Sequence, residues 1–176
     1  MKVIIAGGGI GGLATALMLR ARNIDGQVYE SAARIREAGV GINILPHAIR
    51  ELEALGLLGA LDKVGLRTRS LTYFTKSGQE VWSELRGMHA GHEVPQFSIH
   101  RGRLQKLLFD AFVERAGPEA VITGKRLAGF VQNDAGVTAN FVDTLEGAGG
   151  MTAKGDILVC ADGIPVSYTH LRAHET

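Results

Sequence analysis

Residue types that mark special classes of protein are scarce in this sequence. Its one cysteine, Cys160, excludes a disulfide within the chain and fits a reducing compartment, so we expect a cytoplasmic protein. The 19 basic and 18 acidic residues are interspersed, which leaves no basic stripe for nucleic acid. The apolar run over residues 10–19 is shorter than the ~20 residues that span a membrane. We therefore expect neither a membrane partner nor a targeting segment.

Glycine, in contrast, is abundant. The 24 glycines are clustered at turns between apolar runs rather than spread through a low-complexity linker. Hydrophobic residues make up 45% of the chain, which is enough for a sizeable core. Together these features predict a tightly turned α/β protein.

The order of the apolar segments predicts a βαβ unit at the start of the chain. Residues 2–6 are apolar and β-branched, residues 10–22 carry apolar side chains at helical spacing, and residues 27–30 suit a second strand. Such a unit implies a parallel sheet. The other expected elements are an extended stretch over 40–45, a helix over 46–55 ended by Gly56, antiparallel strands within 69–85 turned at Ser77-Gly78, a strand over 96–100, a helix over 101–115, and strands over 121–123, 127–132, 137–142 and 156–160.

The first turn of the βαβ unit has the spacing G-x-G-x-x-G. Gly7 serves the turn off the strand, Gly9 lets the backbone approach a pyrophosphate, and Gly12 lets the helix pack on the sheet. The helix that follows presents its N–H groups and the positive end of its dipole to the phosphates. The residues expected to bind a cofactor here are Gly7, Gly9, Ile10, Gly11 and Gly12.

Glu30 ends the second strand, eighteen residues beyond Gly12. A carboxylate at this place accepts hydrogen bonds from both hydroxyls of an adenosine ribose, and it argues against NADP because it disfavours a 2′-phosphate. The spacing leaves FAD and NAD both open. An NAD-dependent dehydrogenase therefore remains an alternative at this point, as does a merely structural glycine turn.

Three further segments carry a resemblance to a known family. They are Gly-Val-Gly-Ile-Asn-Ile-Leu-Pro at 39–46, Ser-Ile-His-Arg-Gly-Arg-Leu-Gln at 98–105 and Val-Cys-Ala-Asp-Gly at 159–163. Over residues 2–164 the chain resembles the FAD-dependent monooxygenases of the p-hydroxybenzoate hydroxylase type. Trp82-Ser83-Glu84 and Pro95-Gln96 are similar to its phenazine-modifying branch, the 5-methylphenazine-1-carboxylate 1-monooxygenases. These motifs indicate a flavin enzyme but do not select one substrate.

The resemblance implies an α/β fold over residues 1–164: a Rossmann-like FAD-binding domain with a parallel sheet, in which residues 69–100 begin an antiparallel substrate-side sheet. It also implies that Glu30 binds the adenosine ribose and that Arg101 meets the phosphate or ribityl region, a role that suits a forked guanidinium. Gln105, one helical turn later, lies on the same side. The other implied cofactor contacts are Arg36, the backbone of Val40 and Gly41, the backbone of Leu127 at the adenine, and Asp162.

The reaction is likewise implied by the resemblance. The expected enzyme hydroxylates a small aromatic substrate with O₂, with FAD as cofactor and NADH or NADPH as transient reductant. Because the cofactor carries the chemistry, no acid–base pair is expected and no catalytic residue is assigned. No metal site is expected, since His89 and His92 have no further ligands nearby in sequence. Cys160 is interpreted as a small buried residue, and no oligomeric state is indicated.

The family pattern breaks after Ile164. The family has a serine and an arginine where this chain has Val166 and Thr169, and residues 165–176 contain no expected core element. We therefore expect this segment to be an artefactual tail, and the chain to be truncated, the N-terminal portion of a longer enzyme. The remaining alternative is an inactive nucleotide-binding fragment. Weak or no turnover and marginal stability are expected of the chain alone.

Overall fold

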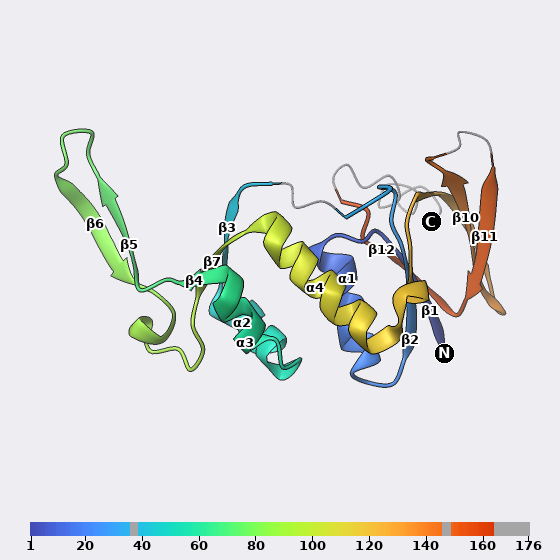
Figure 1. The fold of residues 1–176 in the computed structure, drawn as a ribbon, viewed down its shortest axis with the longest axis horizontal. Coiled ribbons are helices and arrows are strands. Elements are labelled where there is room, and N and C mark those ends of the chain that lie inside the picture. The colour runs from blue at the N-terminus through green and yellow to red at the C-terminus, as the bar shows by residue number, and fades with distance from the viewer. Residues whose placement is uncertain (36–38, 146–148, 164–176) are drawn as a thin grey trace. The chain divides into compact units, whose positions relative to one another are not determined.

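The structure is a computed structural model that describes residues 1–35, 39–145 and 149–163. The chain divides into two units, one formed by Met1–Arg36 with Leu108–Thr176 and the other by Glu37–Leu107 (Figure 1). Arg36 and the expected tail at 165–176 lie outside the described residues. The predictions made for them therefore stay predictions.

The first unit contains a parallel sheet in the order β12-β1-β2-β8. The side chains from Val3 to Ala6 in β1 are almost completely buried, as expected for a strand whose sheet is covered on both faces. The predicted βαβ unit and parallel sheet are confirmed. The strands are β1 (Lys2–Ala6), β2 (Asp25–Tyr29), β8 (Val121–Ile122) and β12 (Ile157–Cys160).

One face of the parallel sheet is covered by α1 (Ile10–Arg20), whose Leu13 and Leu17 side chains are fully buried (Figure 1). The helix was predicted to reach residue 22, which is wrong by two residues. Asn23 adopts a left-handed backbone conformation, with φ +57°, and asparagine is one of the few residues that tolerate it. The chain therefore turns toward β2 before another helical turn can form.

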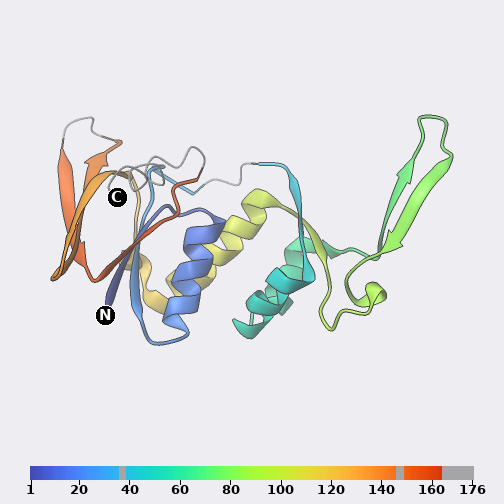
Figure 2. The same ribbon diagram turned by 180° about the vertical axis from the view of Figure 1, so that it is seen from behind.

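The opposite face of the parallel sheet packs against an antiparallel sheet in the order β11-β10-β9 (Figures 1 and 2). Ile4 and Ala6 share a buried cluster with Leu127 and Phe141 across the two sheets. The Tyr29 ring stacks on Phe141 with 4.3 Å between centroids, and burial raises the pKa of Tyr29. The unit thus has three layers: helix, parallel sheet and antiparallel sheet. The strands of the third layer are β9 (Lys125–Asn133), β10 (Gly136–Asp143) and β11 (Gly150–Gly155).

β11 was not predicted, because its sequence was interpreted as a glycine-rich turn. Ala153 lies opposite Ala139 of β10, and both side chains are buried. A Cβ added to Gly155 would approach Lys2 O to 2.9 Å. Glycine within a strand often marks such a close backbone approach, and the approach depends on a partner strand that is distant in sequence.

The second unit is built around an antiparallel sheet in the order β3-β7-β4. Phe97 and Ile99 of β7 are buried, and the unit also buries Ile49 and Leu61 completely. The elements are β3 (Gly41–Ile44), α2 (Pro46–Ala54), α3 (Leu58–Val64), β4 (Gly65–Arg67), β7 (Phe97–His100) and the first residues of α4 (Arg101–Ala116).

Most predicted elements of the second unit are confirmed to within one residue. α2 ends before Gly56, which has the positive φ, +73°, that glycine tolerates after a helix. The confirmed predictions are the extended stretch over 40–45, the helix over 46–55, the strand over 96–100 and the helix over 101–115.

α3 and β4 were not predicted, because a helix of seven residues and a strand of three carry little periodic signal. A bidentate contact joins them: Nε and Nη2 of Arg67 each donate to the Asp62 carboxylate over 2.7 Å. This hydrogen bonding lowers the pKa of Asp62.

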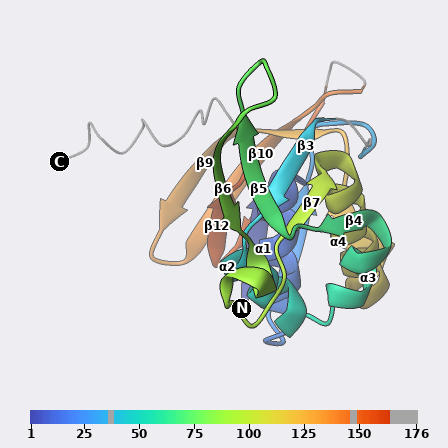
Figure 3. The ribbon, with the colours of Figure 1, turned by 90° about the vertical axis from the view of Figure 1, so that its left-hand side faces the viewer.

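β5 (Ser70–Phe74) and β6 (Glu80–Leu85) form a two-stranded hairpin (Figure 3). The predicted antiparallel strands and their turn at Ser77-Gly78 are confirmed, and Gly78 has φ +84°. Most side chains of both strands are exposed. A 3₁₀ turn, η1 (Gly87–Ala90), follows β6.

Candidate cofactor site

The turn between β1 and α1 consists of Gly7, Gly8 and Gly9. Gly7 has φ +114°, a conformation that side-chain-bearing residues rarely adopt, and its N–H donates to Tyr29 O over 2.7 Å. A Cβ on Gly7 would lie 2.2 Å from Ala161 O. The glycine loop therefore lies directly against the residues that follow β12, and only glycine fits there.

Gly12 lies in the first turn of α1, where a Cβ would come within 1.9 Å of Gly7 O. This glycine thus allows the helix to pack against the loop. Around Gly9 and Gly11, in contrast, no atom lies within 4 Å of an added Cβ. Of the five glycines between Gly7 and Gly12, the first and last are closely enclosed by backbone, Gly8 faces the Glu30 side chain, and the remaining two are open.

The open part of the loop coincides with the start of α1. Gly9 is the N-cap residue, with no side chain bonded to the helix end, and the half-buried Ile10 begins the helix. N–H groups in the first turn have no acceptor within the helix, and they carry the positive end of its dipole. A helix start with free space above it suits an anionic group.

Glu30 directly follows β2, and its carboxylate faces the glycine loop. Oε2 accepts a hydrogen bond from Gly8 N over 2.6 Å, while Oε1 accepts from Ala32 N over 2.7 Å and from Ser31 Oγ over 3.0 Å. The parallel topology places Glu30 beside the loop, because the carboxyl ends of β1 and β2 meet at one edge of the sheet. A carboxylate offers about four acceptor positions, so these three donors do not exhaust it.

The chain after β12 reaches the same edge. Asp162 is exposed, and its N atom lies 2.9 Å from the Cβ position of Gly7. Leu127, predicted to meet the adenine through its backbone, has a buried side chain in β9 opposite Phe141. The structure therefore brings Asp162 to the glycine loop and places Leu127 within the core of the same unit.

The interpretation of Cys160 as a buried residue is wrong, since Cys160 is exposed. Its strand, β12, is the end strand of the sheet and pairs only with β1 among the described residues. The thiol itself is partly desolvated. Burial, and then the negative charge of Asp162, raise the pKa of Cys160.

Four other predicted site residues belong to the second unit or its helix α4. Arg101 N donates to Val40 O over 3.0 Å, which brings Arg101 and the Val40-Gly41 backbone together. Arg101 is exposed at the start of α4, and Gln105 follows one turn later and is half-buried. His100, which the sequence reasoning did not single out, donates from Nε2 to Gly39 O over 3.0 Å and helps to fix this segment.

Neither a metal centre nor a membrane span is found in the described part of the chain. No group of three or more histidine, cysteine, aspartate or glutamate side chains gathers there in a way that holds a metal ion. His89 and His92 are both exposed. Over the same residues, no helix combines the length and the apolar character needed to cross a bilayer.

A pocket of about 670 Å³ in the first unit lies beside β12 and the turn between β9 and β10. Its apolar lining includes Phe130, Val137 and Leu158. Neither the glycine loop nor Glu30 lines it, so this pocket is separate from the candidate cofactor site.

The geometry of the loop, the helix start and the carboxylate is that of a dinucleotide site. Comparison with protein families decides which dinucleotide it binds. The family described as FAD binding domain matches residues 1–169. The chain belongs to this family. FAD rather than NAD is therefore the cofactor of this FAD-binding domain, and the dehydrogenase alternative has no support.

Two curated relatives of the FAD-binding domain are named as hydroxylases. The chain is 44% identical over 163 residues to phenazine 1,6-dicarboxylic acid hydroxylase PhzS of Lysobacter antibioticus, covering 92% of this chain and 40% of that protein. It is 30% identical to the FAD-dependent urate hydroxylase of Klebsiella pneumoniae, covering 98% of this chain and 42% of that protein. The chain thus spans about 40% of the length of these relatives. The predicted resemblance to FAD-dependent monooxygenases is confirmed.

Solved structures confirm the fold class. Klebsiella pneumoniae HpxO complexed with FAD and uric acid superposes with a TM-score of 0.74 at 28% identity, over 93% of this chain and 39% of that one. The p-nitrophenol 4-monooxygenase PnpA of Pseudomonas putida DLL-E4 has a TM-score of 0.78 at 19% identity, over 92% of this chain and 40% of that one. The second likeness concerns the fold alone. The FAD-binding domain has the predicted Rossmann-like α/β architecture.

Proposed function

We propose that the protein containing this chain is a monooxygenase that hydroxylates a small aromatic substrate, with FAD as cofactor, O₂ as oxidant and NADH or NADPH as reductant. The family membership and the names of the relatives support this activity. Because the chain spans about 40% of those relatives, the proposal concerns the whole protein. A cytoplasmic location is part of it, in keeping with a single cysteine.

The structural observation that carries the proposal, through its cofactor, is the Glu30 carboxylate held against the glycine loop at the start of α1. We assign the diphosphate of FAD to the loop and the helix start, from Gly7 to Gly12. In that arrangement the first-turn N–H groups donate to phosphate oxygens. The carboxylate of Glu30 accepts from the ribose hydroxyls of the adenosine, while its charge repels a 2′-phosphate.

The other cofactor contacts rest on the family resemblance. Asp162, next to Gly7, is assigned to the phosphate or ribityl region, and Arg101 to the same part of the cofactor. Once bound, FAD supplies the redox chemistry, and the residues of this chain bind and orient it. The remaining proposed contacts are Arg36, Val40, Gly41, Gln105 and the backbone of Leu127.

For the substrate, we propose an aromatic acid of the phenazine type. The relative at 44% identity is named for phenazine 1,6-dicarboxylic acid, and Trp82-Ser83-Glu84 and Pro95-Gln96 resemble the same branch. Residues 69–100 are proposed as the start of the substrate-side sheet, because the β5–β6 hairpin exposes Tyr73 and Trp82. Aromatic faces of this kind suit a flat aromatic ligand.

The test is cofactor binding by this chain, followed by turnover of the whole protein. FAD is titrated into the purified chain and followed by flavin absorbance and fluorescence, with NAD as the competing dinucleotide. We expect FAD to bind and Glu30→Ala to weaken it at least about tenfold, the loss of a charge-assisted hydrogen bond. Preference for NAD, or an unchanged affinity in Glu30→Ala, would contradict the proposed site.

Turnover is tested by oxidation of NADH or NADPH in the presence of phenazine carboxylic acids, with the product identified by mass spectrometry. We expect hydroxylation by the whole protein and little or none by the 176-residue chain. A whole protein that binds FAD and oxidises the reductant without hydroxylating any aromatic acid contradicts the proposed activity while leaving the cofactor site intact.

A further inference from the structure

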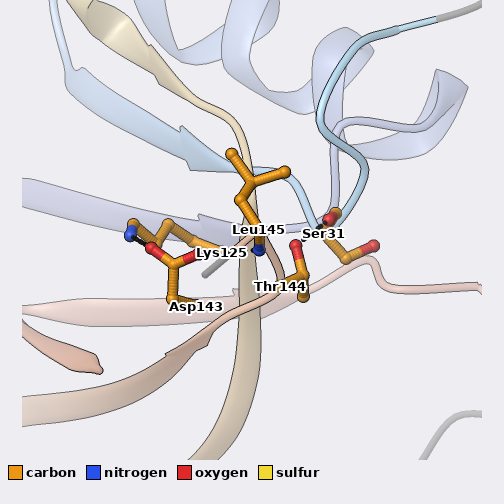
Figure 4. A network of polar contacts seen from close by, with 5 residues as sticks. All are labelled: Ser31, Lys125, Asp143, Thr144 and Leu145. Atoms are coloured by element: carbon orange, nitrogen blue, oxygen red, sulfur yellow. Dashed lines mark hydrogen bonds and ion pairs between the residues drawn. The ribbon is translucent and has the colours of Figure 1, made fainter. Parts of the chain in front are cut away.

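A polar network joins the end of β10 to the residues that follow β2 (Figure 4). The Thr144 hydroxyl donates a hydrogen bond to Ser31 O over 2.7 Å, and Thr144 N donates to Gly124 O over 2.9 Å. All these residues belong to the first unit. Ser31 directly follows Glu30, so the network ends beside the carboxylate at the glycine loop.

The carbonyl groups of residues 30–32 each accept one hydrogen bond from the segments around β9 and β10. The backbone of this turn is therefore held at every residue. Of the three donors, only the Thr144 hydroxyl is a side-chain group, so it alone can be removed by a substitution without changing the backbone. The bonds are Lys125 N to Glu30 O at 2.8 Å, Thr144 Oγ1 to Ser31 O at 2.7 Å and Gly124 N to Ala32 O at 3.1 Å.

The position of this turn decides where the Glu30 carboxylate lies. Oε1 accepts hydrogen bonds from Ser31 Oγ and Ala32 N, which are both part of the turn, while Oε2 accepts from Gly8 N. A shift of Ser31 and Ala32 therefore moves the carboxylate relative to the loop. Thr144 acts on Glu30 through this turn, because its own hydroxyl donates to the Ser31 carbonyl.

Thr144 is in turn held by its neighbour Asp143. One carboxylate oxygen of Asp143 accepts from Leu145 N over 2.7 Å, and the other forms an ion pair with Lys125 Nζ (Figure 4). The Lys125 and Asp143 side chains are only 22% and 13% exposed, so salt screens this pair less than a surface pair. The residues before and after Thr144 in the chain are thus both held by polar contacts.

We propose that Thr144 is a positioning residue for Glu30, whose hydroxyl sets the turn at residues 31–32 and so aims the carboxylate at the ribose. This inference rests on the proposed function, in which Glu30 accepts from the ribose hydroxyls. Thr144 improves the nucleotide's fit without contacting it. Its loss should therefore reduce the recognition of the ribose more than the binding of the phosphates.

The test compares ADP with 2′-deoxy-ADP, two probes that differ only in a ribose hydroxyl. Their dissociation constants are measured by calorimetry for the wild-type chain and for Thr144→Val, Thr144→Ser and Glu30→Gln. Thr152→Val is the matched control, because Thr152 is an exposed threonine of β11 in the same unit. Thermal unfolding of each variant is recorded alongside.

We expect the wild-type chain to bind ADP about tenfold more tightly than 2′-deoxy-ADP, as one hydrogen bond to a charged group provides. The ratio of the dissociation constant of 2′-deoxy-ADP to that of ADP should fall to about twofold in Glu30→Gln and in Thr144→Val. Thr144→Ser restores the hydroxyl and should keep the wild-type ratio, as should Thr152→Val.

Two results overturn the inference. If Glu30→Gln lowers the ratio and Thr144→Val does not, or if Thr144→Val weakens both nucleotides equally, Thr144 does not position Glu30, although Glu30 still binds the ribose. If Glu30→Gln keeps the wild-type ratio, or the wild-type chain does not distinguish the two nucleotides, the proposed role of Glu30 fails and the role of Thr144 fails with it.

Discussion

The glycines of the loop differ in what surrounds them. This difference distinguishes a glycine that is needed for folding from one that is needed for ligand binding. At Gly12 an added Cβ meets backbone at 1.9 Å, whereas at Gly9 it meets nothing within 4 Å. Backbone atoms cannot move aside as a flexible side chain can. Gly12 is therefore required by the packing of α1, and Gly9 is required only if a ligand approaches the loop.

Gly12→Ala and Gly9→Ala should consequently differ in their effects on stability and on FAD affinity. Gly12→Ala should destabilise the chain by about 1–3 kcal/mol, the usual cost of overpacking, and also weaken FAD binding. Gly9→Ala should change the stability by less than about 1 kcal/mol and yet lower the FAD affinity at least about tenfold, because the methyl group fills the space assigned to phosphate. Urea unfolding and FAD titration measure both quantities.

Gly59→Ala is the control for these variants. Gly59 lies within α3, has no atom within 4 Å of an added Cβ, and belongs to the second unit. Alanine there should stabilise the helix by about 0.5–1 kcal/mol and leave FAD binding unchanged. Full FAD affinity in Gly9→Ala would show that the open space above the loop is not used by the cofactor.

The single cysteine provides a second prediction at this scale. Burial and the charge of Asp162 raise the pKa of Cys160, and only the thiolate reacts with alkylating agents. Iodoacetamide should therefore modify the folded chain more slowly at neutral pH than the urea-unfolded chain. In the folded chain, the reaction rate should rise at a higher pH than it does for an ordinary cysteine thiol. Asp162→Asn should shift this pH profile downward.

Mass spectrometry follows the reaction without ambiguity, since the chain has one cysteine. Equal rates for the folded and unfolded chain at every pH would mean that the thiol is not desolvated. An unshifted pH profile in Asp162→Asn would mean that the aspartate charge does not raise the pKa of the Cys160 thiol.

At the scale of elements, the β5–β6 hairpin stands apart from the other strands. It forms a two-stranded sheet, and such a pair is marginally stable in water by itself. The Tyr73 and Trp82 rings pair across the strands with 5.7 Å between centroids, and Thr72 bonds Ser83 over 2.8 Å. These contacts define the register of the strands but bury little apolar surface.

Trp82 reports on this hairpin because it is the one tryptophan of the chain and is 46% exposed. We expect red-shifted emission and efficient acrylamide quenching in the folded chain, with only a small change on unfolding in urea. Tyr73→Ala should increase the quenching further, since it removes the paired ring. Blue-shifted, poorly quenched emission in the folded chain would mean that the hairpin is covered.

At the scale of the whole molecule, the candidate site is assembled from segments far apart in the sequence. The glycine loop, Glu30 and Asp162 follow β1, β2 and β12, which are parallel neighbours, so their carboxyl ends lie at one edge of the sheet. The antiparallel layer holds the turn after Glu30 through Thr144. The chain forms this part of the site within one unit, although it spans about 40% of its relatives' length.

Much of this arrangement was predictable because the signals are local. The glycine spacing, the apolar run of β1 and the strand ending at Glu30 lie within thirty residues and predict the βαβ unit without any distant contact. β11 and the exposed Cys160 were missed, since each depends on which strands lie beside it. The assignments of Arg101, Gln105 and Leu127 to the cofactor came from family resemblance and remain predictions.

The sequence by itself determined the βαβ unit and the tight glycine turn, because backbone conformation and apolar periodicity are set by neighbouring residues. The choice of FAD over NAD came from the resemblance of whole motifs to a family, which the match over residues 1–169 confirms. Only the tertiary structure decided that Thr144 holds the turn beside Glu30. That contact joins residues 113 positions apart, and no local pattern records which hydroxyl meets which carbonyl once the sheets have packed.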